Sequence, residues 1–330
     1  MEVLRGGVDV ERRVTEMVAH AKHALRVEFG NKFLLVCVGR HKMATATAMA
    51  APSCSAPRNV YIDAGVNWCN TLEIYKRIPE VRQRDVWQVF GFEASRRILP
   101  FADGCARALS AGEPLPEPPL PPAGSSKELA KYASRYNCSL QQLGLDQRSE
   151  HDRKEYRRHR LVPCMMAALA QNFSRVRPDP ALSDPSLLRD RLALGARCSV
   201  PRSSYVMLPA AIGAREGKLA MKDSDAGLIT GGRTNLNVPT ESYSTPQVDF
   251  SAWLRASFTE ADFVVLKMDV EGGEHSIVPK MVADGTLKLV DVFLWECHFM
   301  PKSWHSPCHR LKRLLKDNGV GAIYEDPYPW

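Results

Sequence analysis

A carboxylate and a glycine follow the first strongly apolar segment of this chain. Asp63 comes directly after Val60-Tyr61-Ile62, and Gly65 follows two residues later, ahead of a polar stretch. Glycine in a strand-to-helix turn lets the backbone approach a ligand closely, and the helix start offers free N–H donors and partial positive charge. An aspartate at this turn can hold the ammonium group of an aminoacyl cofactor. The alternative is an ordinary strand-to-helix turn.

A second carboxylate ends the next apolar segment, Val86 to Phe92. Glu93 stands there, 28 positions after Gly65 (93 − 65). A carboxylate at the end of the second strand can accept hydrogen bonds from both ribose hydroxyls of a nucleoside cofactor, as in dinucleotide-binding folds. The glycine turn and the acid together are more specific than either feature alone.

Three further acids, Asp269, Glu271 and Glu274, follow the apolar segment Phe263 to Met268. Ligands of open α/β sheets bind at the carboxyl ends of the strands, where this cluster would lie. Helix capping and compensation of the helix dipole are the structural alternative, but they explain one or two acids better than three.

A histidine follows the last strongly apolar segment, in Trp295-Glu296-Cys297-His298. Histidine at the edge of a site can act as a general base because it ordinarily titrates near neutral pH. The alternative is a structural histidine bonded to nearby backbone. The histidines and cysteines between 297 and 309 match no common zinc spacing, so no resident metal is expected.

The order of the segments predicts an α/β fold. Strands and helices alternate over 60–110 and again over 205–324, which is typical of a parallel sheet covered by helices. A turn at Arg215–Gly217 is expected to join two hairpin strands. The predicted strands are 60–62, 86–92, 205–208, 262–270, 290–296 and an edge strand at 322–324, and the predicted helices are 70–77, 96–110, 272–287 and 309–318.

Two regions lie outside this alternation. Residues 1–57 are expected to form one amphipathic helix over 8–29 and a linker, ahead of a domain over 58–330. That domain is interrupted over about 112–200 by the proline-rich segment 112–125 and a helical insertion.

Composition bounds the classes of function. The chain has 330 residues, of which 25% are charged and 45% hydrophobic, and a formal charge of +7, so it is globular and too weakly basic to predict nucleic-acid binding. No apolar run is long enough to span a bilayer. The nine cysteines are scattered without a C-x-x-C motif, which favours reduced thiols and a cytoplasmic location. An organelle is one alternative, because residues 43–57 are rich in Ala, Ser and Thr, as transit segments are, and the secretory lumen is another.

The motifs together resemble the FkbM family of methyltransferases. The matching segments are "YIDAGVNWCN", "VFGFEAS", "LPAAIGAREGKL", "LKMDVEGGEHSIV" and "WECHF", which cover residues 60–110 and 205–299. The resemblance implies a class I methyltransferase fold with a doubly wound, mostly parallel seven-stranded sheet. It also implies S-adenosylmethionine as cofactor and methylation of a hydroxyl on a sugar or small metabolite.

The resemblance also assigns residues. Asp63, Gly65 and Asn67 would contact the amino-acid end of the cofactor, Glu93 would hold the ribose, and Ala210 would lie against the adenine. The chain departs from the family at Cys69, where glycine is usual, and in the insertion at about 112–200.

Methyl transfer to an alcohol needs alignment of the reactants and a base that takes the hydroxyl proton. The expected catalytic residues are Asp269, Glu271 and His298, with His298 or Asp269 as the base. A reaction assisted by a metal on Asp269, Glu271 or Glu296 is an alternative. Two other functions stay open: an NAD-dependent oxidoreductase, which lacks its Gly-x-Gly-x-x-Gly motif here, and a catalytically inactive binding module of the same fold. The sequence predicts neither the acceptor nor the oligomeric state.

Overall fold

The computed structural model divides the chain into two compact units, Met1–Met49 and Ala50–Trp330. In the first unit, β1 (Leu25–Phe29) pairs antiparallel with β2 (Lys32–Val36). The helix predicted over 8–29 is therefore wrong for its last five residues, and its remainder lies outside the described residues. The structure describes residues 25–29, 32–36, 54, 56–116, 138, 164, 177–198, 200–222, 242–298 and 307–325.

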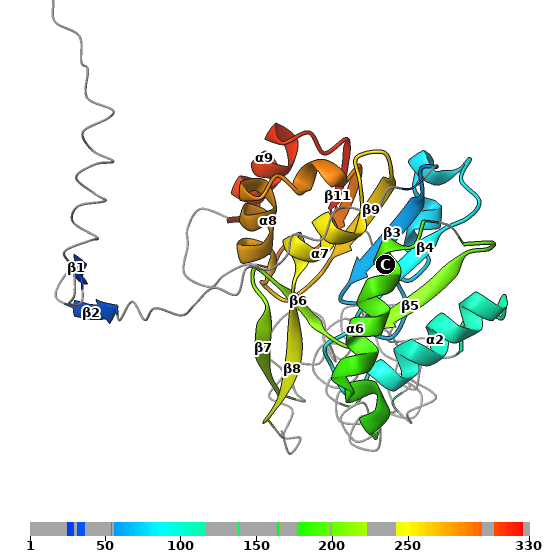
Figure 1. The fold of residues 1–330 in the computed structure, drawn as a ribbon, viewed down its shortest axis with the longest axis horizontal. Coiled ribbons are helices and arrows are strands. Elements are labelled where there is room, and N and C mark those ends of the chain that lie inside the picture. Colours follow the sequence, from blue (N-terminus) through cyan, green and yellow to red (C-terminus); the bar gives the residue numbers. More distant parts are fainter. Residues whose placement is uncertain are drawn as a thin grey trace, which may run out of the picture. The chain divides into compact units, whose positions relative to one another are not determined.

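A six-stranded sheet forms the centre of the second unit (Figure 1). Its strands run in the order β11-β10-β9-β3-β4-β5, and every neighbouring pair is parallel. This confirms the predicted α/β class with a mostly parallel sheet. The strands are β3 (Asn59–Ala64), β4 (Gln88–Phe92), β5 (Ser204–Leu208), β9 (Phe263–Met268), β10 (Val292–Trp295) and β11 (Ala322–Glu325).

The strand order is that of a doubly wound sheet. The chain enters at β3 in the middle, builds outward to β5, and then crosses to β9 on the other side of β3. The direction of winding therefore reverses between β3 and β9. Ligands of open α/β sheets bind at the carboxyl ends of strands at this reversal point, because the loops there diverge to opposite faces.

Apolar side chains on both faces of the sheet build the core. Tyr61 and Ile62 are both fully buried but belong to different apolar clusters, as expected for successive residues of a strand. This is why the strands are continuously apolar rather than alternating. One cluster includes residues of α2 (Leu99–Ala111) and of the 3₁₀ helices Ile74–Arg77 and Pro79–Val81; the other includes residues of α6 (Pro185–Ala193), α7 (Phe250–Ser257), α8 (Glu274–Ala283) and α9 (Pro307–Asp317).

A smaller sheet contains β6 (Ala211–Gly213), β7 (Gly217–Lys222) and β8 (Ser242–Asp249). The turn predicted at Arg215–Gly217 overlaps the bend that joins β6 to β7, which begins at Gly217, but the predicted hairpin is wrong. β8 lies between them, parallel to β6 and antiparallel to β7. The pairing partner comes from a distant part of the sequence, which turn chemistry does not reveal.

The helix predicted over 70–77 is also wrong in its first half. The described backbone has turns as far as Glu73 and then a single 3₁₀ turn over Ile74–Arg77. Cys69 adopts a left-handed conformation with φ of 68°, which is incompatible with continuous α-helix at that point. Glycine tolerates this conformation best, which agrees with the glycine that the resemblance leads one to expect there.

Eight of the nine cysteines form disulfides, so the prediction of mostly reduced thiols is wrong. The spacing of the cysteines did not predict these bonds, because folding brings together cysteines as far as 144 residues apart. The bonds are Cys54–Cys198, Cys69–Cys105, Cys138–Cys164 and Cys297–Cys308.

The insertion predicted over 112–200 falls largely outside the described residues. Gly112 caps the end of α2, residues 113–116 have neither helix nor strand, and α6 lies near the end of the predicted insertion. In the parts of the chain that the structure describes, no helix has both the length and the apolar character that crossing a membrane requires.

Candidate functional site

Backbone hydrogen bonds extend the central sheet at its carboxyl edge. Four residues that follow strands each donate from the backbone N–H to the last residue of the neighbouring strand. These bonds place Glu93, Gly65, Asp269 and Glu296 next to one another at the ends of four adjacent strands, β4, β3, β9 and β10, as expected for residues that follow parallel strands. They run from Glu93 to Leu208 (3.1 Å), Gly65 to Phe92 (3.1 Å), Asp269 to Ala64 (3.0 Å) and Glu296 to Met268 (3.1 Å).

Gly65 occupies the reversal point between β3 and β9 and is required there. Its φ is 89°, which disfavours any L side chain. A Cβ at this position would also lie 1.9 Å from the backbone carbonyl oxygen of Asp269. The turn and the loop after β9 therefore pack backbone to backbone, and only glycine permits the contact.

Lys267 links the two sides of this reversal point, and sequence reasoning did not assign it to the site. Its side chain on β9 is fully buried, and Nζ donates to the backbone oxygen of Gly65 at 2.6 Å. The same ammonium lies 3.3 Å from Oδ1 of Asp63 and 3.4 Å from Oδ2 of Asp269. The available signal was a lysine inside an otherwise apolar strand, because a buried ammonium needs a carboxylate or carbonyl partner.

Asp63 is completely buried beneath the turn. Its Oδ2 accepts a hydrogen bond from the hydroxyl of Thr71 at 2.7 Å, while Oδ1 faces Lys267. Burial raises the pKa of Asp63, although the nearby Lys267 ammonium and the Thr71 bond lower it. Both carboxylate oxygens therefore contact side chains of the protein, those of Thr71 and Lys267, and these contacts orient the Gly65 turn. The predicted contact of Asp63 with a cofactor ammonium group stays a prediction.

Glu93 and Asn67 lie together on the other side of the turn. The carboxylate of Glu93 accepts backbone N–H bonds from Asn67 at 2.9 Å (Oε2) and Ser95 at 2.7 Å (Oε1). Burial raises the pKa of Glu93 to about 7, although these two bonds lower it. Each oxygen keeps a second lone pair, so the group can also accept from ligand hydroxyls. Ala210, the predicted adenine contact, is fully buried just after β5.

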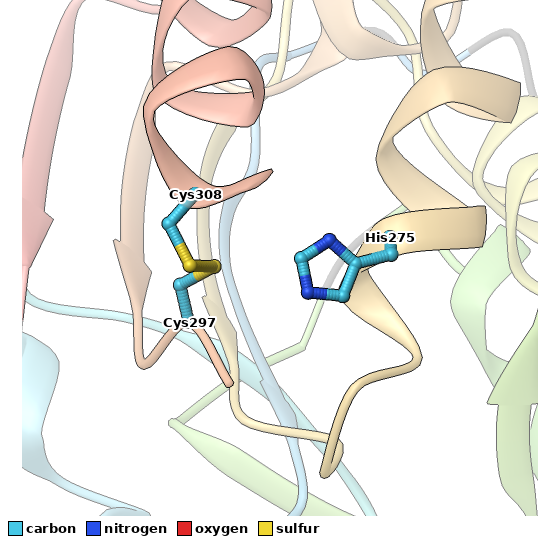
Figure 2. A group of neighbouring side chains, drawn as sticks. All are labelled: His275, Cys297 and Cys308. Carbon is cyan, nitrogen blue, oxygen red and sulfur yellow. A yellow bond between two sulfur atoms is a disulfide. The ribbon is translucent and has the colours of Figure 1, made fainter. Parts of the chain in front are cut away.

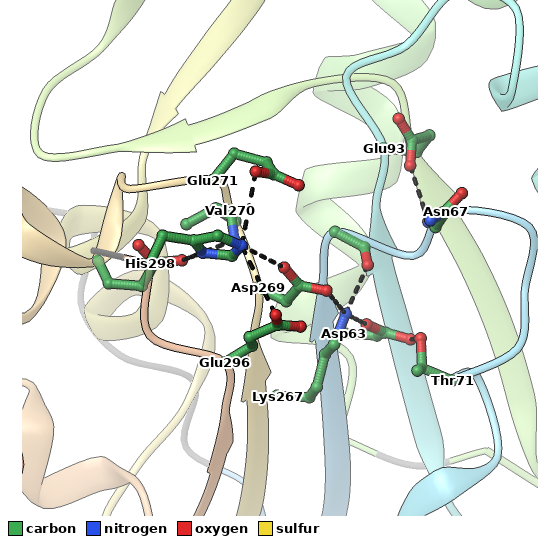
Figure 3. A network of polar contacts seen from close by, with 12 residues as sticks. Asp63, Asn67, Thr71, Glu93, Lys267, Asp269, Val270, Glu271, Glu296 and His298 are labelled. Carbon is green, nitrogen blue, oxygen red and sulfur yellow. Dashed lines mark hydrogen bonds and ion pairs between the residues drawn. The ribbon is translucent and has the colours of Figure 1, made fainter. Parts of the chain in front are cut away.

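The ring of His298 lies beside three carboxylates that follow β9 and β10, those of Asp269, Glu271 and Glu296 (Figure 3). Nδ1 is 3.2 Å from Oε1 of Glu274, which belongs to α8. Nε2 is 3.5 Å from Glu271, 3.8 Å from Asp269 and 4.0 Å from Glu296. The structure thus brings all three predicted catalytic residues together, and adds Glu274 and Glu296.

These carboxylates change the titration of His298. Burial lowers its pKa, but the hydrogen bond to Glu274 and the charges of Glu271 and Asp269 raise it to about 9. This pKa lies above the near-neutral value that the sequence leads one to expect for His298. At pH 7 the ring carries a proton that a base would first have to lose.

A disulfide anchors the segment that carries His298. Cys297 is bonded to Cys308 at the start of α9, and the His275 ring from α8 lies beside the two sulfur atoms (Figure 2). His275 Nε2 lies 2.7 Å from the backbone oxygen of His298. The position of His298 is thus fixed from two helices as well as from β10.

Comparison with models of known protein families found no match, and neither did comparison with curated proteins or with solved structures. The resemblance to FkbM methyltransferases therefore depends on the sequence motifs alone.

Proposed function

We propose that this protein is an S-adenosylmethionine-dependent methyltransferase that methylates a hydroxyl oxygen of a sugar or small metabolite. One observation carries the proposal: Gly65, whose backbone contact tolerates no side chain, lies at the winding reversal with the Glu93 carboxylate at the end of the next strand. This arrangement suits a nucleoside cofactor laid across the carboxyl edge of the sheet.

The cofactor would extend along this edge in the order of the strands. Glu93 accepts the ribose hydroxyls, Ala210 after β5 lies toward the adenine, and the turn from Gly65 to Asn67 meets the amino-acid end. The class I fold has seven strands, whereas six are described in the central sheet, and the seventh stays a prediction.

In the proposed reaction, a lone pair of the acceptor oxygen forms the new O–CH₃ bond as the S–CH₃ bond breaks. The electron pair of the broken bond stays on sulfur, which leaves S-adenosylhomocysteine, and the hydroxyl proton passes to a base. Asp269 and His298 are the two candidates. The raised pKa of His298 favours Asp269 as the acceptor in the metal-free protein, with Glu271 and His298 orienting the alcohol.

The doubly wound strand order is shared with dinucleotide-binding folds, which supports the alternative of an NAD-dependent oxidoreductase. Calorimetric titration with S-adenosylhomocysteine and with NAD separates the two. We expect S-adenosylhomocysteine to bind and NAD not to bind. Glu93→Ala should weaken the binding free energy of S-adenosylhomocysteine by at least ~1.5 kcal/mol, because charge-assisted hydrogen bonds are lost. Binding of NAD alone would reverse the assignment.

A screen with radiolabelled cofactor against glycans and small alcohols then identifies the acceptor. Cofactor binding without turnover on any acceptor would support a catalytically inactive binding module instead. The departure at Cys69, which is tied to α2 by its disulfide with Cys105, is the feature that keeps this alternative in view.

The four disulfides also bear on location. Structural disulfides are typical of oxidising compartments and rare in the cytosol. We therefore propose an organelle or the secretory lumen in preference to the cytoplasmic location expected from cysteine spacing.

A further inference from the structure

We propose that Asp269, Glu271 and His298 form a binding site for a divalent cation, best suited to Mn²⁺. One ligand atom from each of the three residues lies within 4.8 Å of the other two. The donors come from two neighbouring strand ends, β9 and β10, that the fold holds in register. The site mixes carboxylate and imidazole donors, so it is more than an accumulation of surface acids.

The spacing of the donors suits coordination. Two ligand atoms, each about 2.1 Å from a cation and at about 90–110° to each other, lie about 3.0–3.4 Å apart. His298 Nε2 lies 3.5 Å from Glu271 Oε2 and 3.8 Å from Asp269 Oδ1. These two separations exceed the coordination range by a few tenths of an ångström, and the three ligand atoms all lie within 4.8 Å of one another. Glu296 Oε1, at 4.0 Å from Nε2, can reach the same ion directly or through water.

Glu274 provides the outer support that a metal-binding histidine usually has. Metal-ligating histidines generally use their second ring nitrogen to bond a carboxylate or carbonyl, which fixes the tautomer. Glu274 Oε1 lies 3.2 Å from Nδ1 of His298 and also accepts the backbone N–H of Val270 at 2.9 Å. With the proton on Nδ1, the lone pair of Nε2 points toward the carboxylates of Asp269 and Glu271.

The burial of Glu274 is a second, independent indication of a ligand. Its side chain is fully buried, and its Oε2 has no hydrogen-bond partner among the described residues. A buried carboxylate oxygen without a partner is costly. A cation on the far side of the His298 ring would stabilise this negative charge through the imidazole.

The donor set indicates the class of cation. Carboxylates suit Mg²⁺, Ca²⁺ and Mn²⁺, whereas imidazole suits the later transition metals. Mn²⁺ accepts both kinds of ligand, so we expect it to bind more tightly than Mg²⁺ or Ca²⁺.

The role of the cation rests on the proposed function. Asp269 packs against Gly65, so the ion would lie at the reversal point, beside the Gly65 turn that we propose contacts the cofactor. There it would bind the acceptor oxygen, orient it toward the methyl group and lower the pKa of its hydroxyl. The proton would then leave to a neighbouring carboxylate or to water without passing through His298.

Binding of Mn²⁺ alone to the full-length, disulfide-intact protein tests the site without any cofactor. Calorimetry and electron paramagnetic resonance should show one saturable Mn²⁺ per chain, with imidazole nitrogen coupled to the ion. Asp269→Asn should weaken binding at least tenfold and keep the nitrogen coupling, whereas His298→Gln should remove the coupling. Glu260→Gln is the matched control, because it neutralises an exposed carboxylate that pairs with Lys288, and it should leave binding unchanged.

Circular dichroism establishes that each variant is folded, and the isosteric Asp269→Asn retains the shape of the site. The proposal is overturned if Mn²⁺ shows no saturable binding at millimolar concentration, or if both variants bind as the wild type does. Mn²⁺ binding by a protein that binds no S-adenosylhomocysteine would uphold the cation site and reject the proposed methyl transfer.

Discussion

A Cβ atom on Gly65 would lie 1.9 Å from the backbone oxygen of Asp269, although the two residues are 204 positions apart (269 − 65). The contact joins the loops that follow β3 and β9, the two strands between which the winding of the sheet reverses. The predicted cofactor turn and the predicted catalytic cluster are therefore parts of one structure, and a change in either loop must displace the other.

This contact predicts that Gly65→Ala impairs both stability and cofactor binding. The substitution adds a collision with backbone to the strain of a positive φ, so the loop after β9 must move. We expect S-adenosylhomocysteine affinity to fall at least tenfold and the loss of unfolding free energy to exceed the ~1–2 kcal/mol typical of left-handed strain alone.

Gly112→Ala separates the two causes. Gly112 also has a positive φ, 79°, but a Cβ there would meet nothing within 4 Å. Urea unfolding should show a clearly smaller loss for Gly112→Ala than for Gly65→Ala. Equal losses would mean that the approach to Asp269 contributes nothing.

Much of this site follows from the sequence because the strand-end rule is geometric. Once 60–62, 86–92 and 262–270 are identified as buried parallel strands, Gly65, Glu93 and Asp269 must lie along one edge. The rule needs only the type and order of the elements. The α/β class and the edge strand at the C-terminal end are predictable for the same reason.

The remainder depends on contacts that local patterns do not encode. Leu25, Val27 and Phe29 alternate with polar residues, but Leu25 also continues a helical pattern from Val10. Gly30-Asn31, a dipeptide typical of two-residue hairpin turns, was the signal for β1 and β2. Lys267 within an apolar strand was a comparable signal for a buried ion pair, because an ammonium group inside the sheet needs a carboxylate or carbonyl partner. The raised pKa of His298 depends on its hydrogen bond to Glu274 in α8. The spacing of the two residues in the sequence does not predict that their side chains meet.

Removal of the buried ammonium at Lys267 should strongly destabilise the protein. Lys267→Met leaves the buried carboxylate of Asp63 without its cation, and breaking a buried ion pair typically costs ~3–5 kcal/mol. The double variant Lys267→Met/Asp63→Asn should recover part of this loss, because the unpaired charge is removed. Lys288→Met removes the exposed lysine that pairs with Glu260, and it should change the unfolding free energy by less than ~1 kcal/mol. Strictly additive effects of the two buried substitutions would contradict the coupling.

The disulfide framework predicts how many cysteines are available for labelling. Protein produced under oxidising conditions, denatured in guanidinium chloride and treated with iodoacetamide should take up one label, because eight of nine cysteines are paired. Prior reduction should raise the number to nine. Peptide mass spectrometry should locate the single label at Cys37, and labelling of Cys69 or Cys297 without reductant would contradict the pairing of these two cysteines in disulfides.

Glu93 should make cofactor binding depend on pH around neutrality. Burial raises its pKa to about 7, and ribose hydroxyls donate to the ionised carboxylate. Affinity for S-adenosylhomocysteine should therefore increase as pH rises from 6 to 8. Glu93→Gln should flatten this profile and weaken binding at pH 8 by about tenfold. The control Glu113→Gln, at an exposed position after α2, should retain the wild-type profile.

The same group sets an opposite trend for the stability of the unliganded protein. Between the ordinary pKa of 4.5 and the folded value of about 7, the folded chain binds more protons at Glu93 than the unfolded chain does. Its contribution to stability is therefore present below pH 4.5 and is lost as pH rises through about 7. Glu93→Gln cannot ionise, so urea unfolding should find this variant gaining stability relative to the wild type between pH 5 and pH 8. A constant difference over that range would mean that Glu93 titrates normally, and the pH dependence expected for cofactor binding would lose its basis.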